Sequence, residues 1–82
     1  MNKRMRKHRR LDSVEGGKTV KIVNNHTSGK LKQKLLDMGF IPGSEIRVVR
    51  EAPLYDPMEV TLFNYNVSLR KSEAYLLEVE EQ

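Results

Sequence analysis

The residues of this chain that could do chemistry are few, and their spacing argues against catalysis and metal binding. The chain has no cysteine and two histidines, His8 and His26, which lie far apart in the sequence. His8 falls in a basic N-terminal stretch and His26 in an expected loop, so we expect no common metal site for them. No nucleophile and base stand at a spacing typical of a catalytic pair. We therefore predict a protein that is not an enzyme and holds neither a metal nor a cofactor.

One short motif, Gly17-Lys18-Thr19, has the ending of a phosphate-binding loop. Such a loop requires a glycine where Asp12 stands, and it requires a helix directly after the threonine. The residues that follow, VKIV, predict a strand instead. Without a helix N-terminus the backbone offers no amide groups for a phosphate, so we reject a nucleotide site.

The charge distribution separates a basic tail from a mildly acidic domain. Six of the fifteen Lys and Arg residues lie in the first ten positions, MNKRMRKHRR, and the remaining nine stand against eleven acidic residues. We expect residues 1–10 to be disordered and dispensable for folding, and residues 11–82 to form one domain. The tail is either simply solvated or attracted to an anionic partner, and its charge does not distinguish a membrane surface from RNA.

Three lysines crowd the first half of the expected helix Lys30–Met38, namely Lys30, Lys32 and Lys34. The helix dipole favours acidic residues in this position, and Lys30 repels Lys34 one turn further on. Two interpretations remain open. The lysines form either a solvated face that tolerates small penalties or a basic patch that faces an acidic partner.

A proline-stiffened loop follows the expected strand Glu45–Glu51. Its sequence, APLYDP, places Leu54 and Tyr55 at the tip between two prolines, followed by Asp56. The apolar tip residues either pack locally over the end of the domain or contact a partner, since rigid exposed aromatic residues are favoured at interfaces. We therefore take Leu54, Tyr55 and Asp56, together with the three lysines, as candidate partner-binding residues.

The helix that positions the lysines also organises the core. Leu31, Leu35 and Met38 recur on one helix face, and Gly39 is the expected left-handed cap. Phe40 and Ile41 are expected to pack back onto that face.

Short alternating segments around this helix predict strands near residues 19–24, 45–51, 58–63, 67–69 and 75–80. Inward positions include Val20, Ile22 and Ile46. A tight hairpin turn is expected at Asn64-Tyr65-Asn66, and a single helical turn at residues 70–74. The predicted fold is mostly β, a small SH3-like barrel of about five strands with one short α-helix after the first strand.

Three segments of the chain resemble the bacterial ferrous iron transport protein A (FeoA) family. They are LLDMGFIPGSEIRVV (35–49), APLYDPMEV (52–60) and NYNVSLRKSEAYLLEV (64–79). The sequence departs from the family pattern at Tyr55 and Asn64, where the family usually has glycine, and in the basic tail, which the pattern lacks.

This resemblance implies an SH3-like fold and a small cytoplasmic accessory or regulatory protein of ferrous iron uptake. The implied partner is the ferrous iron permease (FeoB), which carries an N-terminal GTP-binding domain. We expect a monomer without a small-molecule substrate, located in the cytoplasm, with its tail able to contact the inner face of the cell membrane. The alternative hypothesis is a small barrel that binds RNA or another nucleic acid through the basic tail.

Overall fold

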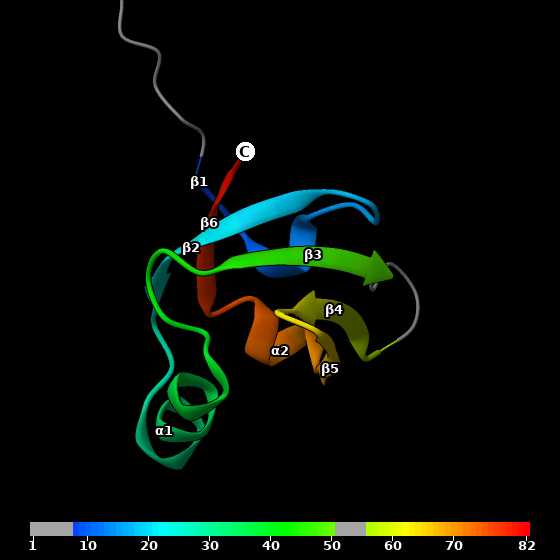
Figure 1. The fold of residues 1–82 in the computed structure, drawn as a ribbon. Coiled ribbons are helices and arrows are strands. Elements are labelled where there is room, and N and C mark those ends of the chain that lie inside the picture. Colours follow the sequence, from blue (N-terminus) through cyan, green and yellow to red (C-terminus); the bar gives the residue numbers. More distant parts are fainter. Residues whose placement is uncertain (1–7, 51–55) are drawn as a thin grey trace, which may run out of the picture.

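The structure is a computed structural model that describes residues 8–50 and 56–82 of the chain. Strands form a strongly bent sheet, and one longer helix lies at the end of the molecule away from β1 (Figure 1). The elements, in chain order, are β1 (His8–Arg10), a 3₁₀ turn (Leu11–Ser13), β2 (Thr19–Asn25), α1 (Gly29–Met38), β3 (Glu45–Arg50), β4 (Met58–Leu62), β5 (Tyr65–Leu69), α2 (Lys71–Ala74) and β6 (Leu77–Glu81).

The sheet is antiparallel throughout, in the order β1-β6-β2-β3-β4-β5. The last strand of the chain therefore lies between the first two, which brings both ends of the described chain to one side of the sheet. The predicted mostly β fold with one short helix is confirmed. Six strands are present in the described residues, one more than the expected five.

The additional strand is β1, which lies inside the stretch that was expected to be disordered. It pairs with β6 in a register that runs from His8↔Glu80 to Arg10↔Glu78. The expectation of disorder is therefore wrong for residues 8–10. Composition could not indicate this strand, because its partner stands at the other end of the sequence.

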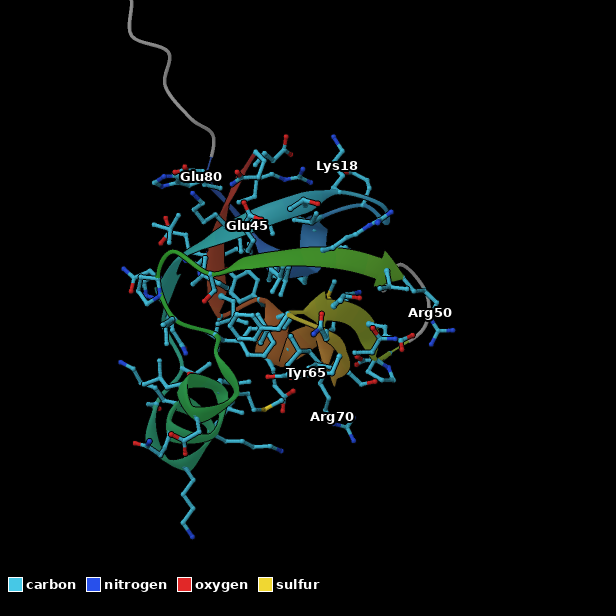
Figure 2. The ribbon with its side chains drawn as sticks, in the orientation of Figure 1. Lys18, Glu45, Arg50, Tyr65, Arg70 and Glu80 are labelled. Carbon is cyan, nitrogen blue, oxygen red and sulfur yellow. The ribbon has the colours of Figure 1, made fainter. Side chains whose placement is uncertain are left out.

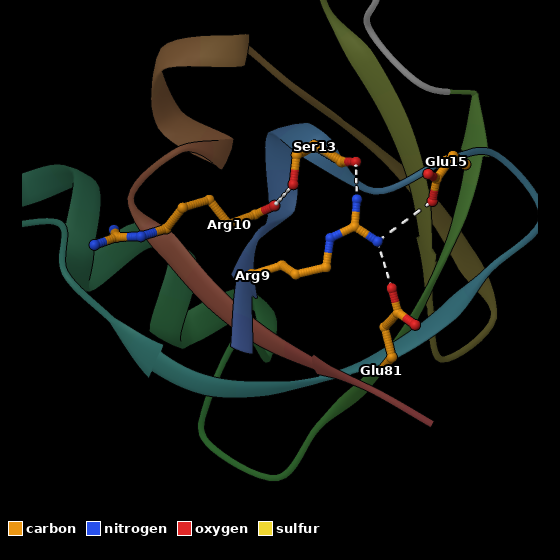
Figure 3. Close-up of polar contacts among 5 residues, drawn as sticks. All are labelled: Arg9, Arg10, Ser13, Glu15 and Glu81. Carbon is orange, nitrogen blue, oxygen red and sulfur yellow. Dashed lines mark hydrogen bonds and ion pairs between the residues drawn. The ribbon is translucent and has the colours of Figure 1, made fainter. Parts of the chain in front are cut away.

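A cluster of polar contacts around Arg9 fixes β1 against the rest of the sheet (Figure 3). The guanidinium donates hydrogen bonds to the Glu81 carboxylate and to the Ser13 carbonyl, and it lies 3.4 Å from Glu15 Oε1. The bond to Glu81 is the main reason why the pKa of Arg9 is raised above its ordinary value. Glu15 and Glu81, near the two ends of the domain, thus bind Arg9, one of the basic residues of the N-terminal stretch.

The helix α1 ends as the sequence predicts. Gly39 adopts a left-handed conformation with φ of 111°, and its N–H donates to the Leu36 carbonyl at 3.0 Å. Leu35 and Phe40 are both buried, which confirms that they pack in the core. Ile41 is 46% exposed, so its predicted packing is wrong. The Ile41 N–H donates to the Gly39 carbonyl at 2.8 Å. This hydrogen bond closes a tight turn, so the Ile41 side chain does not reach the helix face.

The core forms from alternate residues of the strands, as expected. Val20, Ile22 and Ile46 are each 2% exposed or less. The 3₁₀ turn and α2 close the barrel with further buried side chains. The other buried apolar residues are Leu11, Val14, Val48, Met58, Val60, Leu62, Val67, Leu69, Ala74, Leu77 and Val79.

The hairpin between β4 and β5 turns earlier than predicted. Leu62 pairs directly with Tyr65, so the two-residue turn is Phe63-Asn64 rather than Asn64-Tyr65-Asn66. The core sets this register, because Val60 must face Val67 for both side chains to be buried. Phe63 takes a positive φ of 57° in this turn.

Candidate functional site

A polar pocket of about 370 Å³ lies where α1, the start of β4 and the beginning of α2 meet. We call it the Asp56 pocket. Lys34 comes from α1, Ser68 from β5 and Glu73 from α2. The other residues directly precede β4 or α2. Its lining residues are Lys34, Asp56, Pro57, Ser68, Arg70 and Glu73.

The two carboxylates of the pocket hold the beginning of α2. Asp56 Oδ1 accepts a hydrogen bond of 2.6 Å from the Lys71 N–H, and Glu73 Oε1 accepts one of 2.9 Å from the Arg70 N–H. The first N–H groups of a helix have no partner within the helix, so such carboxylates satisfy donors that would otherwise be unpaired. Asp56 therefore has a structural role, which the sequence did not indicate.

The two cations of the pocket have no such partner. Lys34 and Arg70 are both exposed, and no residue of the described ranges forms a hydrogen bond or ion pair with either side chain. Figure 2 shows Arg70 projecting away from the barrel. Two positive charges that form no ion pair with a described residue can bind an anionic group from another molecule.

The structure brings together only part of the residues that the sequence singled out. Lys34 and Asp56 line the same pocket, whereas Lys30 and Lys32 are exposed elsewhere on α1. Two positions along a helix differ by roughly 200°, so Lys32 faces away from Lys34. Leu54 and Tyr55 lie outside the described residues.

Arg70 is the pocket residue that sequence reasoning missed. It belongs to the last segment that resembles the family, but no sequence pattern distinguishes it from the other arginines. Its position directly before the single helical turn at Lys71–Ala74 was the available signal, because a residue there projects beside the helix N-terminus.

A second polar cluster lies on β6 and its neighbours. His26 Nε2 is 2.9 Å from Glu78 Oε1, and His8 Nδ1 is 3.1 Å from Glu78 Oε2. His8 Nε2 also lies 3.4 Å from Glu80 Oε1. The hydrogen bond from His26 is the main cause of the lowered pKa of Glu78. The two histidines meet because β1 and β2 flank β6.

Within residues 8–50 and 56–82 no group of three or more His, Asp or Glu side chains could hold a metal ion. No helix there is long and apolar enough to cross a membrane.

The arrangement of strands defines the class of protein as a small SH3-like barrel. The FeoA protein of Stenotrophomonas maltophilia, described with zinc and as a procaryotic SH3 domain protein, has the same fold with a TM-score of 0.75. That match covers 93% of this chain and 89% of that chain at 24% identity, and it bears on the fold alone. A family model for the FeoA domain matches residues 9–81, so the chain belongs to the FeoA family.

Relatives of higher identity agree with this assignment. The solution structure of iron(II) transport protein A from Clostridium thermocellum is 44% identical with a TM-score of 0.80, and the match covers 88% of this chain and 44% of that one. A fusion of Fe(2+) transport protein A with the Fe(2+) transporter FeoB, from Porphyromonas gingivalis, is 41% identical over 71 residues. This match covers 87% of the chain but 8% of the fusion protein. The family resemblance seen in the sequence is confirmed.

Proposed function

We propose that this chain is an accessory protein of ferrous iron uptake that binds the cytosolic part of a ferrous iron permease. Membership of the FeoA family supports this role. The Porphyromonas gingivalis relative supports the choice of partner, because it joins an FeoA segment and an FeoB transporter in one polypeptide. Such a fusion holds the two parts at high effective concentration, an arrangement that favours partners that contact each other. The chain acts by binding, not by catalysis.

The proposed binding surface for the partner is the Asp56 pocket. Lys34 and Arg70 present two exposed positive charges, and no described residue forms an ion pair or hydrogen bond with either side chain. An acidic group of the partner would bind between them, and the charges would also accelerate the encounter. Asp56 fixes α2 and thereby the position of Arg70, so it supports the site without being its main contact.

The loop residues Leu54 and Tyr55 supply the apolar part of this proposed contact. They directly precede Asp56 in the sequence and lie between two prolines. A segment stiffened in this way loses little conformational entropy on binding. Their assignment rests on the sequence, since the structure does not describe residues 51–55.

The test is a binding titration with the cytosolic GTP-binding domain of the permease from the same organism. The variant Lys34→Glu/Arg70→Glu is expected to weaken binding by about tenfold or more, because both positive charges of the pocket are reversed. Lys30→Glu/Lys32→Glu is the matched control, with the same net charge change outside the pocket, and it should change the affinity by about threefold or less. The variant Leu54→Ser/Tyr55→Ser should weaken binding while thermal melting shows a folded domain.

Equal affinities for both charge-reversal variants would contradict the Asp56 pocket as the contact. Absence of binding by the parent protein would contradict the partner. The same titration with a single-stranded RNA, at low and moderate salt, tests the alternative. Tight RNA binding that disappears when residues 1–7 are removed would favour a nucleic-acid function for the tail.

A further inference from the structure

Phe63 combines two features that are unfavourable for an isolated domain. Its φ of 57° lies in the left-handed region, which is rare for residues other than glycine, asparagine and aspartate. Its side chain is also 68% exposed, the highest value among the exposed large apolar residues of the described chain. Backbone strain of this kind clusters at binding sites, where the surrounding structure maintains it.

Contacts beneath the ring hold Phe63 in this position. The ring lies directly over Gly39, because a Cβ at that glycine would stand 2.8 Å from Phe63 Cε2. The neighbouring Tyr65 ring is tilted against it with centroids 6.4 Å apart. Tyr65 is itself fixed by a hydrogen bond of 2.5 Å from its hydroxyl to the Met38 carbonyl. Phe63 is thus supported from one side and presents its other side to solvent.

The exposed ring forms one wall of a groove of about 460 Å³ on the sheet surface. Paired positions across β2, β3 and β4 form its base, since Thr19 pairs with Arg47 and Arg47 with Thr61. The lining residues are Thr19, Glu45, Ile46, Arg47, Thr61 and Phe63. We call it the Phe63 groove. It shares no residue with the Asp56 pocket.

The groove carries the positive charge of Arg47 beside its aromatic wall. Arg47 is exposed, and within the described ranges no carboxylate forms an ion pair or hydrogen bond with it. The only acidic lining residue, Glu45, precedes it by two positions on the same strand and bonds to no described residue either. Residues two positions apart on a strand lie on the same face, with Cα atoms about 6–7 Å apart, so Glu45 and Arg47 face the groove together. An aromatic surface next to a free guanidinium is complementary to an apolar side chain followed by a carboxylate.

We propose that the Phe63 groove binds an extended segment of the protein partner that places an apolar side chain against Phe63 and a carboxylate on Arg47. This inference takes the identity of the partner from the proposed function, whereas the chemistry of the segment comes from the groove. The partner then makes two separate contacts, one at the Asp56 pocket and one here. The left-handed turn keeps the ring in its bound orientation before the partner arrives, which lowers the entropic cost of association.

The experiment measures binding of the permease's cytosolic GTP-binding domain to three variants. Phe63→Gly removes the ring at a position whose backbone conformation suits glycine, so its melting temperature should stay close to that of the parent protein. Its affinity should fall by about tenfold or more. Arg47→Gln should also weaken binding and reduce its dependence on salt. The matched control Arg50→Gln removes the same charge from the same strand outside the groove, so it should change the affinity by about threefold or less.

Amide chemical shifts locate the contact independently. On addition of the domain, the amides of Thr19, Arg47 and Thr61 should shift in the parent protein, and the shifts should be lost in Phe63→Gly. A parent protein that binds, with Phe63→Gly and Arg47→Gln binding equally well, would overturn this inference and leave the proposed function intact. A parent protein that does not bind the domain would overturn both.

Discussion

At the scale of single residues, Glu78 shows how the fold creates contacts that no local pattern contains. Its carboxylate lies within 3.1 Å of ring nitrogens of both His8 and His26, which come from opposite sides of β6. The hydrogen bond to His26 is the first cause of the lowered pKa of Glu78. A carboxyl group with a lowered pKa in the folded state makes stability depend on pH.

Replacing this carboxylate should change the pH dependence of unfolding. Because the folded state lowers the pKa of Glu78, its contribution is present above the pKa of the unfolded chain, about 4.3, and is lost as the pH falls through the lower folded value. The difference in melting temperature between the parent protein and Glu78→Gln should therefore be largest above about pH 5 and shrink toward pH 3. Melting curves across this range measure it.

Glu45→Gln is the control for this comparison. Glu45 is exposed and bonds to no residue of the described chain, so its substitution should change the melting temperature little. A difference for Glu78→Gln that stays the same from pH 7 to pH 3 would show that the contacts with the histidines do not stabilise the folded state.

At the scale of elements, α1 is joined to the barrel through few side chains. Leu35 is the buried residue of the helix, and Leu31 and Met38 pack partly against the core. The left-handed cap at Gly39 then returns the chain so that Phe40 is fully buried. The connection of the helix to the sheet therefore depends strongly on Leu35 and Phe40.

Truncating Leu35 tests this dependence. Leu35→Ala should lower the free energy of unfolding by roughly 2–5 kcal/mol, since it leaves a cavity at the only buried side chain of α1. Denaturant titration measures the loss. The exposed Lys32→Ala is the control within the same helix and should change the value by less than about 0.5 kcal/mol. An unchanged midpoint for Leu35→Ala would show that α1 is not part of the cooperative core.

At the scale of the whole molecule, the two ends of the domain are fastened to each other. Strand β1 pairs with β6, and Arg9 bonds to Glu81 near the C-terminus (Figure 3). The loss of stability on deletion from the N-terminus should therefore begin only when the deletion reaches β1. Removing residues 1–7 leaves every described contact in place, whereas removing residues 1–10 also removes β1 and the Arg9 cluster.

The two deletions should differ in stability. Removal of residues 1–7 should change the free energy of unfolding by less than about 0.5 kcal/mol. Removal of residues 1–10 should lower it by roughly 1–3 kcal/mol, because the carboxylates of Glu81 and Glu15 lose Arg9 and β6 loses a neighbour. Denaturant titration of both proteins gives the comparison. Equal stability of the two would show that β1 does not contribute to the fold.

The sequence by itself determined the local features of this protein. Alternation placed Ile22 and Ile46 in the core, and Gly39 ended the helix, because these features depend on neighbours within a few positions. The family resemblance was also readable, since its motifs are contiguous. The candidate loop residues Leu54 and Tyr55 remain a prediction.

Only the tertiary structure decided which distant residues meet. Pairing of β1 with β6 joined the histidines at Glu78, and the position of α2 joined Lys34 to Arg70 beside Asp56. The pairing of β4 with β5 places Phe63 in the hairpin turn, where the phenyl ring is exposed. These contacts depend on strand order and register, which are set by the packing of the whole core and not by any segment alone.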